Sequence, residues 1–131
     1  MNTVDKIKET AKRIARIGAH LANPYGPTAK KERGTVEMAQ DMTSPLVLVC
    51  DLNTGHVWER EFGTDIKHRE FPETSGLERL ARFDQLVTAA LERQLREEVL
   101  AELVEKRIRR ITKVRSRVLK DNPKRRPTTK K

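Results

Sequence analysis

Hydrophobic residues near the start of the chain recur at intervals of three and four. Within residues 3–22 they are Val4, Ile7, Ala11, Ile14, Ile17 (or the small Gly18) and Leu21. This spacing places them on one side of an α-helix, and Asn2 or Thr3 can serve as its N-cap. The pattern therefore predicts a short amphipathic helix at the N-terminus.

Residues that break regular structure follow this helix. They are Pro24, Gly26, Pro27 and Gly34. Pro and Gly at this density are typical of turns and connections. The stretch TVEMAQDM after them is compatible with one or two helical turns, but it has no clear period. We therefore expect residues 23–45 to form a loop or linker within the folded domain.

The clearest β pattern is LVLVCDLNTGHVWEREF, at residues 46–62. Two runs rich in Val, Leu and aromatic residues flank NTG, which predicts a β-hairpin with a three-residue loop. Pairing Leu52 with His56 across this loop would place Trp58 on the same face as the leucines of the first strand. We expect Trp58 to be a core anchor there, packed on a helix or a partner's sheet, because an isolated hairpin is marginally stable in water.

A long helix is predicted from Leu77 to Asp121. Ser75 and Glu78 have the spacing of a capping box at its start, no Pro or Gly occurs within it, and Pro123 follows its end. A helix of this length exceeds what its own propensity stabilises, so it needs partners along its length.

The apolar stripe of this predicted helix changes direction near residues 96–103. At about 100° per residue, the apolar positions beyond this point lie roughly a quarter turn or more from those before it. Either the helix bends or breaks there, or a straight helix packs against different partners with its two halves. We expect the first half to pack on the hairpin and the N-terminal helix, and the second half to pack on another subunit or molecule. The candidate interface residues are Ile108, Ile111, Val114 and Val118.

These elements predict a mainly α-helical fold with one β-hairpin, which is an α+β arrangement. Its domain is expected at residues 1–105, followed by a basic amphipathic helix at 106–121 and a disordered basic tail at 122–131. The tail is too polar and rich in Pro to fold alone.

Positive charge is concentrated at the C-terminal end. Residues 106–131 contain 13 Lys or Arg and one acid, a net charge of +12, although the whole chain of 131 residues carries +9. The other 105 residues therefore carry −3 (9 − 12). A charge confined to one end indicates binding partners rather than a fold.

An acidic block precedes the basic end. Residues 71–105 contain eight acids and four arginines. Glu102 lies four residues before Lys106, and Glu105 lies four residues before Arg109, so ion pairs along a solvated helix face are expected. The alternative is that the block pairs head to tail with the basic end of a neighbouring subunit.

The basic residues also share one side of the predicted helix. The candidate nucleic-acid-binding residues are Lys106, Arg109, Arg110, Lys113, Arg117 and Lys120 on the helix, and Lys124, Arg125 and Arg126 in the tail. Each cation that neutralises a phosphate releases a counterion, which gives salt-sensitive binding with little sequence preference. We therefore predict a non-catalytic protein that binds DNA or RNA.

The basic segment has three alternative explanations. It could bind an acidic protein surface, it could be a solvated helix end whose cations compensate the helix dipole, or it could bind a membrane surface. The last is disfavoured because the apolar side of the basic helix at residues 106–121 lacks Trp and Phe.

The composition argues against other chemistry. With 36% hydrophobic residues and five aromatic ones, the chain predicts a small core and no large substrate pocket. Cys50 is the single cysteine and is expected to be buried, while His20, His56 and His68 do not have the spacing of metal ligands. We expect no enzymatic activity, metal, cofactor or small-molecule substrate. No apolar stretch predicts a signal peptide or a membrane span, so the cytoplasm or a virion is the expected location. A homo-oligomer or a larger protein assembly is also expected.

The predicted order of helix, β-hairpin, helix and basic tail resembles that of the small head-to-tail joining proteins of tailed phages. The resemblance covers residues 1–95 and rests on element order. It implies an alternative function: a virion assembly or connector protein whose basic end faces packaged DNA or an acidic neighbouring subunit.

Overall fold

The computed structural model describes residues 2–121, with side chains for residues 2–116. Its elements are α1 (Thr3–Gly18), β1 (Thr28–Glu32), β2 (Thr35–Ala39), β3 (Leu46–Asp51), β4 (Val57–Glu61), β5 (Lys67–Phe71) and α2 (Glu73–Asp121). The chain divides into two units, Met1–Gln94 and Leu95–Lys131. The boundary lies within α2, so the first unit contains α1, the sheet and the N-terminal part of α2.

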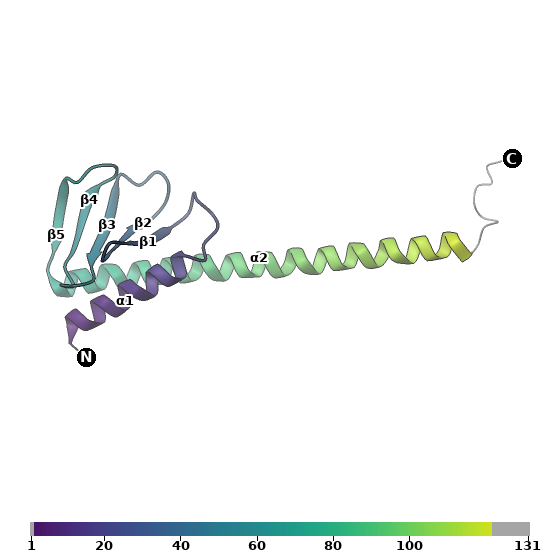
Figure 1. The fold of residues 1–131 in the computed structure, drawn as a ribbon, viewed down its shortest axis with the longest axis horizontal. Coiled ribbons are helices and arrows are strands. Elements are labelled where there is room, and N and C mark those ends of the chain that lie inside the picture. Colours follow the sequence, from purple (N-terminus) through teal and green to yellow (C-terminus); the bar gives the residue numbers. More distant parts are fainter. Residues whose placement is uncertain (1, 122–131) are drawn as a thin grey trace. The chain divides into compact units, whose positions relative to one another are not determined.

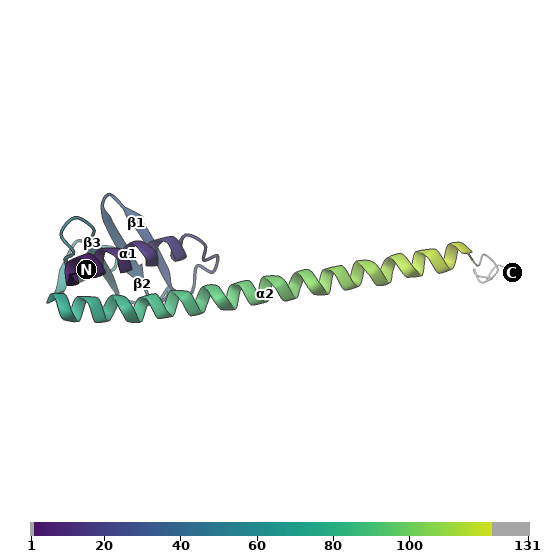
Figure 2. The ribbon, with the colours of Figure 1, turned by 90° about the horizontal axis from the view of Figure 1, so that it is seen from below.

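The first unit is built on a five-stranded antiparallel sheet in which every strand pairs with its neighbour in the sequence. In Figures 1 and 2, α1 and the N-terminal part of α2 lie side by side on one face of this sheet. No helix of the described residues covers the other face of the sheet. The predicted fold class, a mainly helical protein with one β-hairpin, is therefore wrong, because three strands besides the hairpin complete the sheet.

The first two strands lie where a loop was predicted. Glu32 pairs with Thr35, and the two residues between them have positive φ angles, 50° for Arg33 and 83° for Gly34. Positive φ at both central residues is typical of the tight type I′ turn of a β-hairpin. Gly34 therefore closes a hairpin, and the burial of Val36 and Met38 on either side of a less buried Glu37 is the strand period of two.

The outer strands β1 and β5 carry almost no hydrophobic pattern. Each has one buried residue, Ala29 in β1 and Phe71 in β5, among exposed polar ones. Charged residues are common on edge strands because they discourage pairing with other chains. These segments are strands because the neighbouring strands supply backbone hydrogen bonds. Their own sequences predict β-structure only weakly.

The predicted hairpin is present in β3 and β4, but its register differs by one residue. The N–H of Asp51 donates to the carbonyl of His56 at 2.9 Å, so four residues rather than three form the loop. The Asp51 carboxylate accepts the N–H of Asn53 at 2.7 Å, and Gly55 has a φ of 77°. A shift of one residue moves every following side chain to the opposite face. Trp58 therefore pairs with Val49 rather than sharing a face with Cys50.

Helix α1 is confirmed as far as Gly18. The Asn2 side chain accepts the N–H of Asp5 at 2.8 Å and so caps the helix as predicted. Ile7, Ala11 and Ile14 are completely buried against the sheet and α2. The spacing of three and four thus identified the face that the helix buries.

Helix α2 begins at Glu73, before the predicted capping box at Ser75. Its buried residues Leu80, Phe83 and Val87 belong to the same core as α1. A Cβ at Gly76 would lie 3.1 Å from the side chain of Val57, so a glycine at this position lets the helix approach β4 closely.

The helix runs without interruption through residues 96–103, where a bend or a break was one of the expectations. From Leu95 to Ser116 every side chain is exposed. The second unit therefore presents all of its described side chains to solvent, apolar ones included.

Candidate functional site

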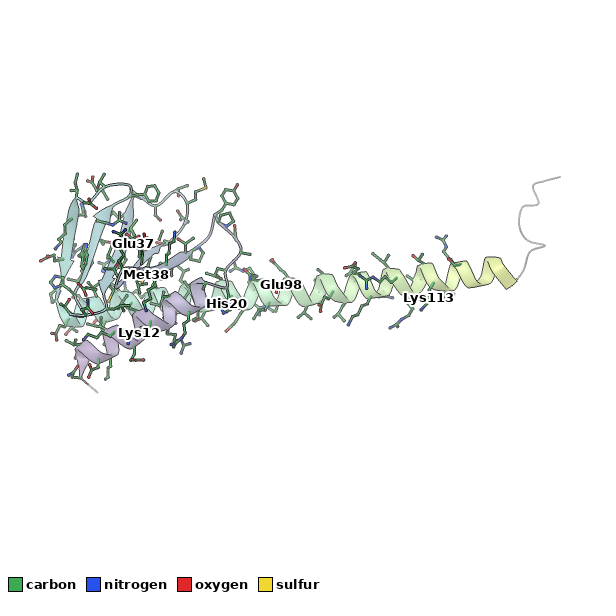
Figure 3. All side chains as sticks on the ribbon, in the orientation of Figure 1. Lys12, His20, Glu37, Met38, Glu98 and Lys113 are labelled. Carbon is green, nitrogen blue, oxygen red and sulfur yellow. The ribbon has the colours of Figure 1, made fainter. Side chains whose placement is uncertain are left out.

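The predicted nucleic-acid-binding residues that the structure describes lie together on the second half of α2. We call Lys106, Arg109, Arg110 and Lys113 the basic face. All four are exposed, and their spacing of one, three and four residues keeps them within one arc of the helix. Figure 3 shows the Lys113 side chain extending from α2.

The remaining predicted contacts lie partly or wholly outside the described residues. Arg117 and Lys120 belong to α2, but their side chains are not described. Lys124, Arg125 and Arg126 lie beyond the last described residue. The structure therefore brings four of the nine predicted residues together.

Acidic residues neutralise little of this charge. Arg109 Nη2 lies 2.8 Å from Glu105 Oε1, which confirms one predicted pair, although both side chains remain exposed. The predicted pair of Glu102 with Lys106 is not formed. From residue 106 to residue 116 the helix has six cations and no acid. Because exposed pairs contribute little and leave the field of the other cations intact, this stretch keeps a net positive charge.

Apolar residues occupy another side of the same helical segment. The predicted interface residues Ile108, Ile111 and Val114 are 57%, 54% and 51% exposed, and the side chain of Val118 is not described. A shallow groove runs along this side, lined by Glu97, Leu100, Ala101, Val104, Glu105 and Ile108. Exposed aliphatic side chains in such a row are typical of a protein interface.

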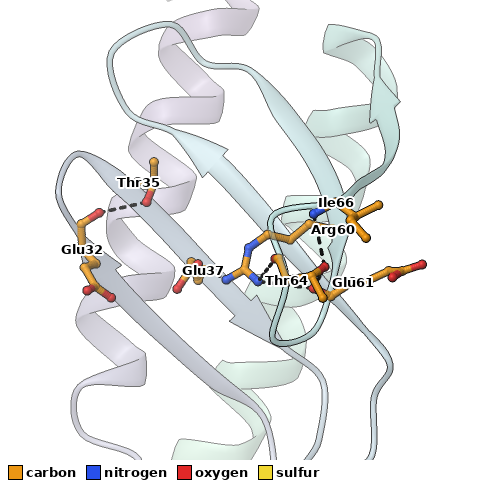
Figure 4. A network of polar contacts seen from close by, with 7 residues as sticks. All are labelled: Glu32, Thr35, Glu37, Arg60, Glu61, Thr64 and Ile66. Carbon is orange, nitrogen blue, oxygen red and sulfur yellow. Dashed lines mark hydrogen bonds and ion pairs between the residues drawn. The ribbon is translucent and has the colours of Figure 1, made fainter.

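The uncovered face of the sheet carries a second group of charged residues, which the sequence analysis did not identify. Arg60 on β4 forms an ion pair with Glu37 on β2, and it also donates to the carbonyl of Thr64 at 3.0 Å (Figure 4). Arg60 reaches Glu37 across β3, over the face that carries Val47 and Val49. This pair covers apolar surface that no helix of the described part covers.

Trp58 lies on this same face and is half-buried. Lys67 Nζ lies 5.0 Å from the centre of the Trp58 ring, and the Glu70 carboxylate contacts Lys67 at 2.6 Å and His56 at 3.4 Å. Hydrogen bonding by Lys67, the Lys67 charge and a smaller effect of His56 lower the pKa of Glu70. The cations here are matched by carboxylates, so this face lacks the unbalanced charge of the basic face.

A cleft of about 520 Å³ in the first unit lies between β2, β3 and α2. Met38, Leu48, Arg79 and Phe83 are among the residues that line it. The Arg79 guanidinium lies 3.8 Å from a Glu59 carboxylate oxygen and 4.4 Å from the Phe71 ring. These contacts hold Arg79 between the sheet and the helix, a structural role.

The described residues contain no group of three His, Cys, Asp or Glu side chains that could hold a metal ion. Cys50 is completely buried, and burial with the nearby Asp51 charge raises its pKa to about 12. A thiol with such a pKa is a poor nucleophile at neutral pH. Cys50 is therefore a core residue, as its position in a strand predicted.

Among the described residues, no helix has an apolar stretch that could cross a bilayer. Comparison with known proteins adds no relative: no protein-family model matches the chain, and neither does any curated protein or solved structure. The basic face and the apolar side of α2 are the candidate functional surfaces on physical grounds.

Proposed function

We propose that this protein binds DNA or RNA, largely independently of sequence, through the basic face of α2. The observation that carries the proposal is the run of six exposed cations without an acid between residues 106 and 116. On a helix, such a run presents charge along about three turns, a length comparable to several phosphates of a nucleic-acid backbone.

The arrangement favours backbone contacts over reading of bases. Phosphate contacts fix position and supply salt-sensitive affinity, whereas specificity requires side chains oriented toward base edges. The described basic face consists of Lys and Arg, with no Asn or Gln among residues 106–116. Sequence preference is therefore expected to be small.

The resemblance to head-to-tail joining proteins, which suggested the connector function, does not support a second proposal. It rested on an element order with one β-hairpin between two helices, and the first unit instead contains five strands. The proposal therefore concerns nucleic-acid binding alone.

The test is fluorescence anisotropy with two labelled DNA duplexes of unrelated sequence over a series of salt concentrations. The variant replaces the basic face: Lys106→Ser, Arg109→Ser, Arg110→Ser and Lys113→Ser. We expect the wild type to bind both duplexes similarly. The slope of log affinity against log salt should fall by about 0.9 for each phosphate contact that the variant removes.

A matched control removes the same charge from the first unit: Lys6→Ser, Lys12→Ser, Lys30→Ser and Lys31→Ser, all of which are exposed. If net charge alone governs binding, the two variants will lose equal affinity. Equal losses would contradict the assignment to the basic face, and a preference of more than about a hundredfold between the duplexes would contradict sequence-independent binding.

A further inference from the structure

The apolar side of the second unit has the spacing of a coiled-coil seam. We define the seam as Glu97, Ala101, Val104, Ile108, Ile111 and Arg115. Its intervals alternate between four and three residues, which is the heptad pattern of helices that pack along their length. Val104, Ile108 and Ile111 are each at least half exposed, so the seam is unpartnered in a single chain.

The charges on the same segment indicate which partner packs on the seam and in which direction. Residues 97–105 contain four acids and no cation, whereas residues 106–116 contain six cations and no acid. All of these residues are exposed. Within the seam, a parallel pair of these helices would place Glu97 against the partner's Glu97 and Arg115 against the partner's Arg115. An antiparallel pair places the acidic half of each helix against the basic half of its partner.

We propose that residues 97–115 pair with the same residues of a second copy, antiparallel, about a two-fold axis at residue 106. In this register, residues equally distant from 106 face each other. Val104 then packs on the partner's Ile108, and Ala101 packs on the partner's Ile111. The seam ends in Glu97 against the partner's Arg115, once at each end, so the apolar layers lie between two ion pairs.

Other registers along the same seam are less favourable. Moving the two-fold axis by half a heptad toward the C-terminus places Val104 against the partner's Arg115. Moving it by the same amount toward the N-terminus places Glu97 against the partner's Ile108. Each of these registers buries a charge against an aliphatic side chain without a partner, which is costly. Residues beside the seam meet the same flank of the partner, so in the proposed register like charges approach only near the axis: Glu105 lies near the partner's Glu105, and Arg107 near the partner's Arg107. These side chains extend into water.

The pairing and the proposed nucleic-acid binding use different sides of the helix. At about 100° per residue, the seam and the basic face point in roughly opposite directions. A pair formed through the seam therefore leaves the basic face accessible. The experiments below are made without nucleic acid, so this inference can fail while the proposed function stands, and the converse also holds.

Disulfide cross-linking of the full chain tests the direction of the pair. The variant with both Ala101→Cys and Ile111→Cys should form a covalent dimer of twice the 15.1 kDa chain mass on oxidation. Each single variant should not, because in the antiparallel register its cysteine faces a residue that is not cysteine. Cys50 stays in all variants as an internal control, since it is buried and its pKa is about 12. Single variants that cross-link as well as the double variant would establish a parallel pair and overturn the proposal.

Charge exchange at the seam ends tests the register. We expect Glu97→Arg and Arg115→Glu each to weaken the dimer at least about tenfold in sedimentation equilibrium, since each change turns two symmetry-related attractions into repulsions. The double variant should restore wild-type association. Glu102→Arg, which makes the same charge change away from the seam, is the matched control. A wild type that stays monomeric, or a double variant as weak as the single ones, would overturn the proposal.

Discussion

Leu80, Ile7 and Ile14 are completely buried where α1 and α2 meet the sheet. These aliphatic side chains, rather than the single tryptophan, make up the centre of the core. Trp58 is half-buried on the opposite face, where its ring contacts Lys67 and His56. Its position follows from the length of the preceding loop, because one additional loop residue reverses the face of every residue after it.

Replacing Leu80 by Ala should therefore destabilise the protein more than replacing Trp58 by Ala. Removing a buried leucine leaves a cavity and lowers the free energy of unfolding by about 2–5 kcal/mol. Trp58→Ala should cost less than about 2 kcal/mol, since the ring is already partly in water. Urea denaturation followed by far-UV circular dichroism measures both. Equal losses would mean that Trp58 contributes to the core after all.

At the scale of elements, Gln94 connects α2 to the segment that follows α1. Its Nε2 donates to the carbonyl of His20 at 2.8 Å, and its Oε1 accepts the N–H of Ala22 at 2.8 Å. Both partners lie in the segment that follows α1. One amide thus satisfies two backbone groups in a segment with no regular structure, and it does so at the last residue of the first unit.

Gln94→Ala should lower the free energy of unfolding by about 1–2 kcal/mol, because two hydrogen bonds are lost and alanine keeps the helix propensity. Gln85→Ala is the matched control, since Gln85 is exposed on the same helix. Its effect should stay within about 0.5 kcal/mol. Chemical denaturation of the two variants decides the matter, and equal stability would show that the Gln94 contacts are not formed in solution.

At the scale of the molecule, folding and the candidate function occupy different parts of the chain. Every buried residue of the described structure lies between residues 7 and 87. The described side chains of the second unit are all exposed and contain the basic face and the seam. The first unit therefore has the core needed for stability, while the second has the surfaces available for partners.

A chain ending at Gln94 should therefore keep the fold of the first unit and lose nucleic-acid binding. We expect cooperative thermal unfolding with a midpoint within about 4–8 °C of that of the full chain, the shift that ~1 kcal/mol causes in a domain of this size. Calorimetry and anisotropy with the same duplexes measure the two properties. A truncated chain that binds DNA with wild-type affinity would place the binding surface in the first unit.

Features with a strong local pattern could be predicted from the sequence. The regular spacing of Ile7, Ala11 and Ile14 predicted α1, because a helix places such residues on one face whatever surrounds it. The long helix and the position of the β3–β4 hairpin were likewise local properties. The concentration of charge after residue 105 required no structure at all.

Tertiary structure decided the remaining features. β1 and β5 are strands because β2 and β4 provide hydrogen-bonding partners. With one buried residue each, their own sequences show no hydrophobic alternation that would predict a strand. The register of β3 and β4 depended on how the Asp51 carboxylate and Gly55 close the loop, which set the face of Trp58. The sequence by itself thus determined where helices form, which face α1 buries and where charge collects, since these depend on neighbours along the chain. Only the fold determined the edge strands and which face of the sheet is buried, because these depend on segments distant in sequence.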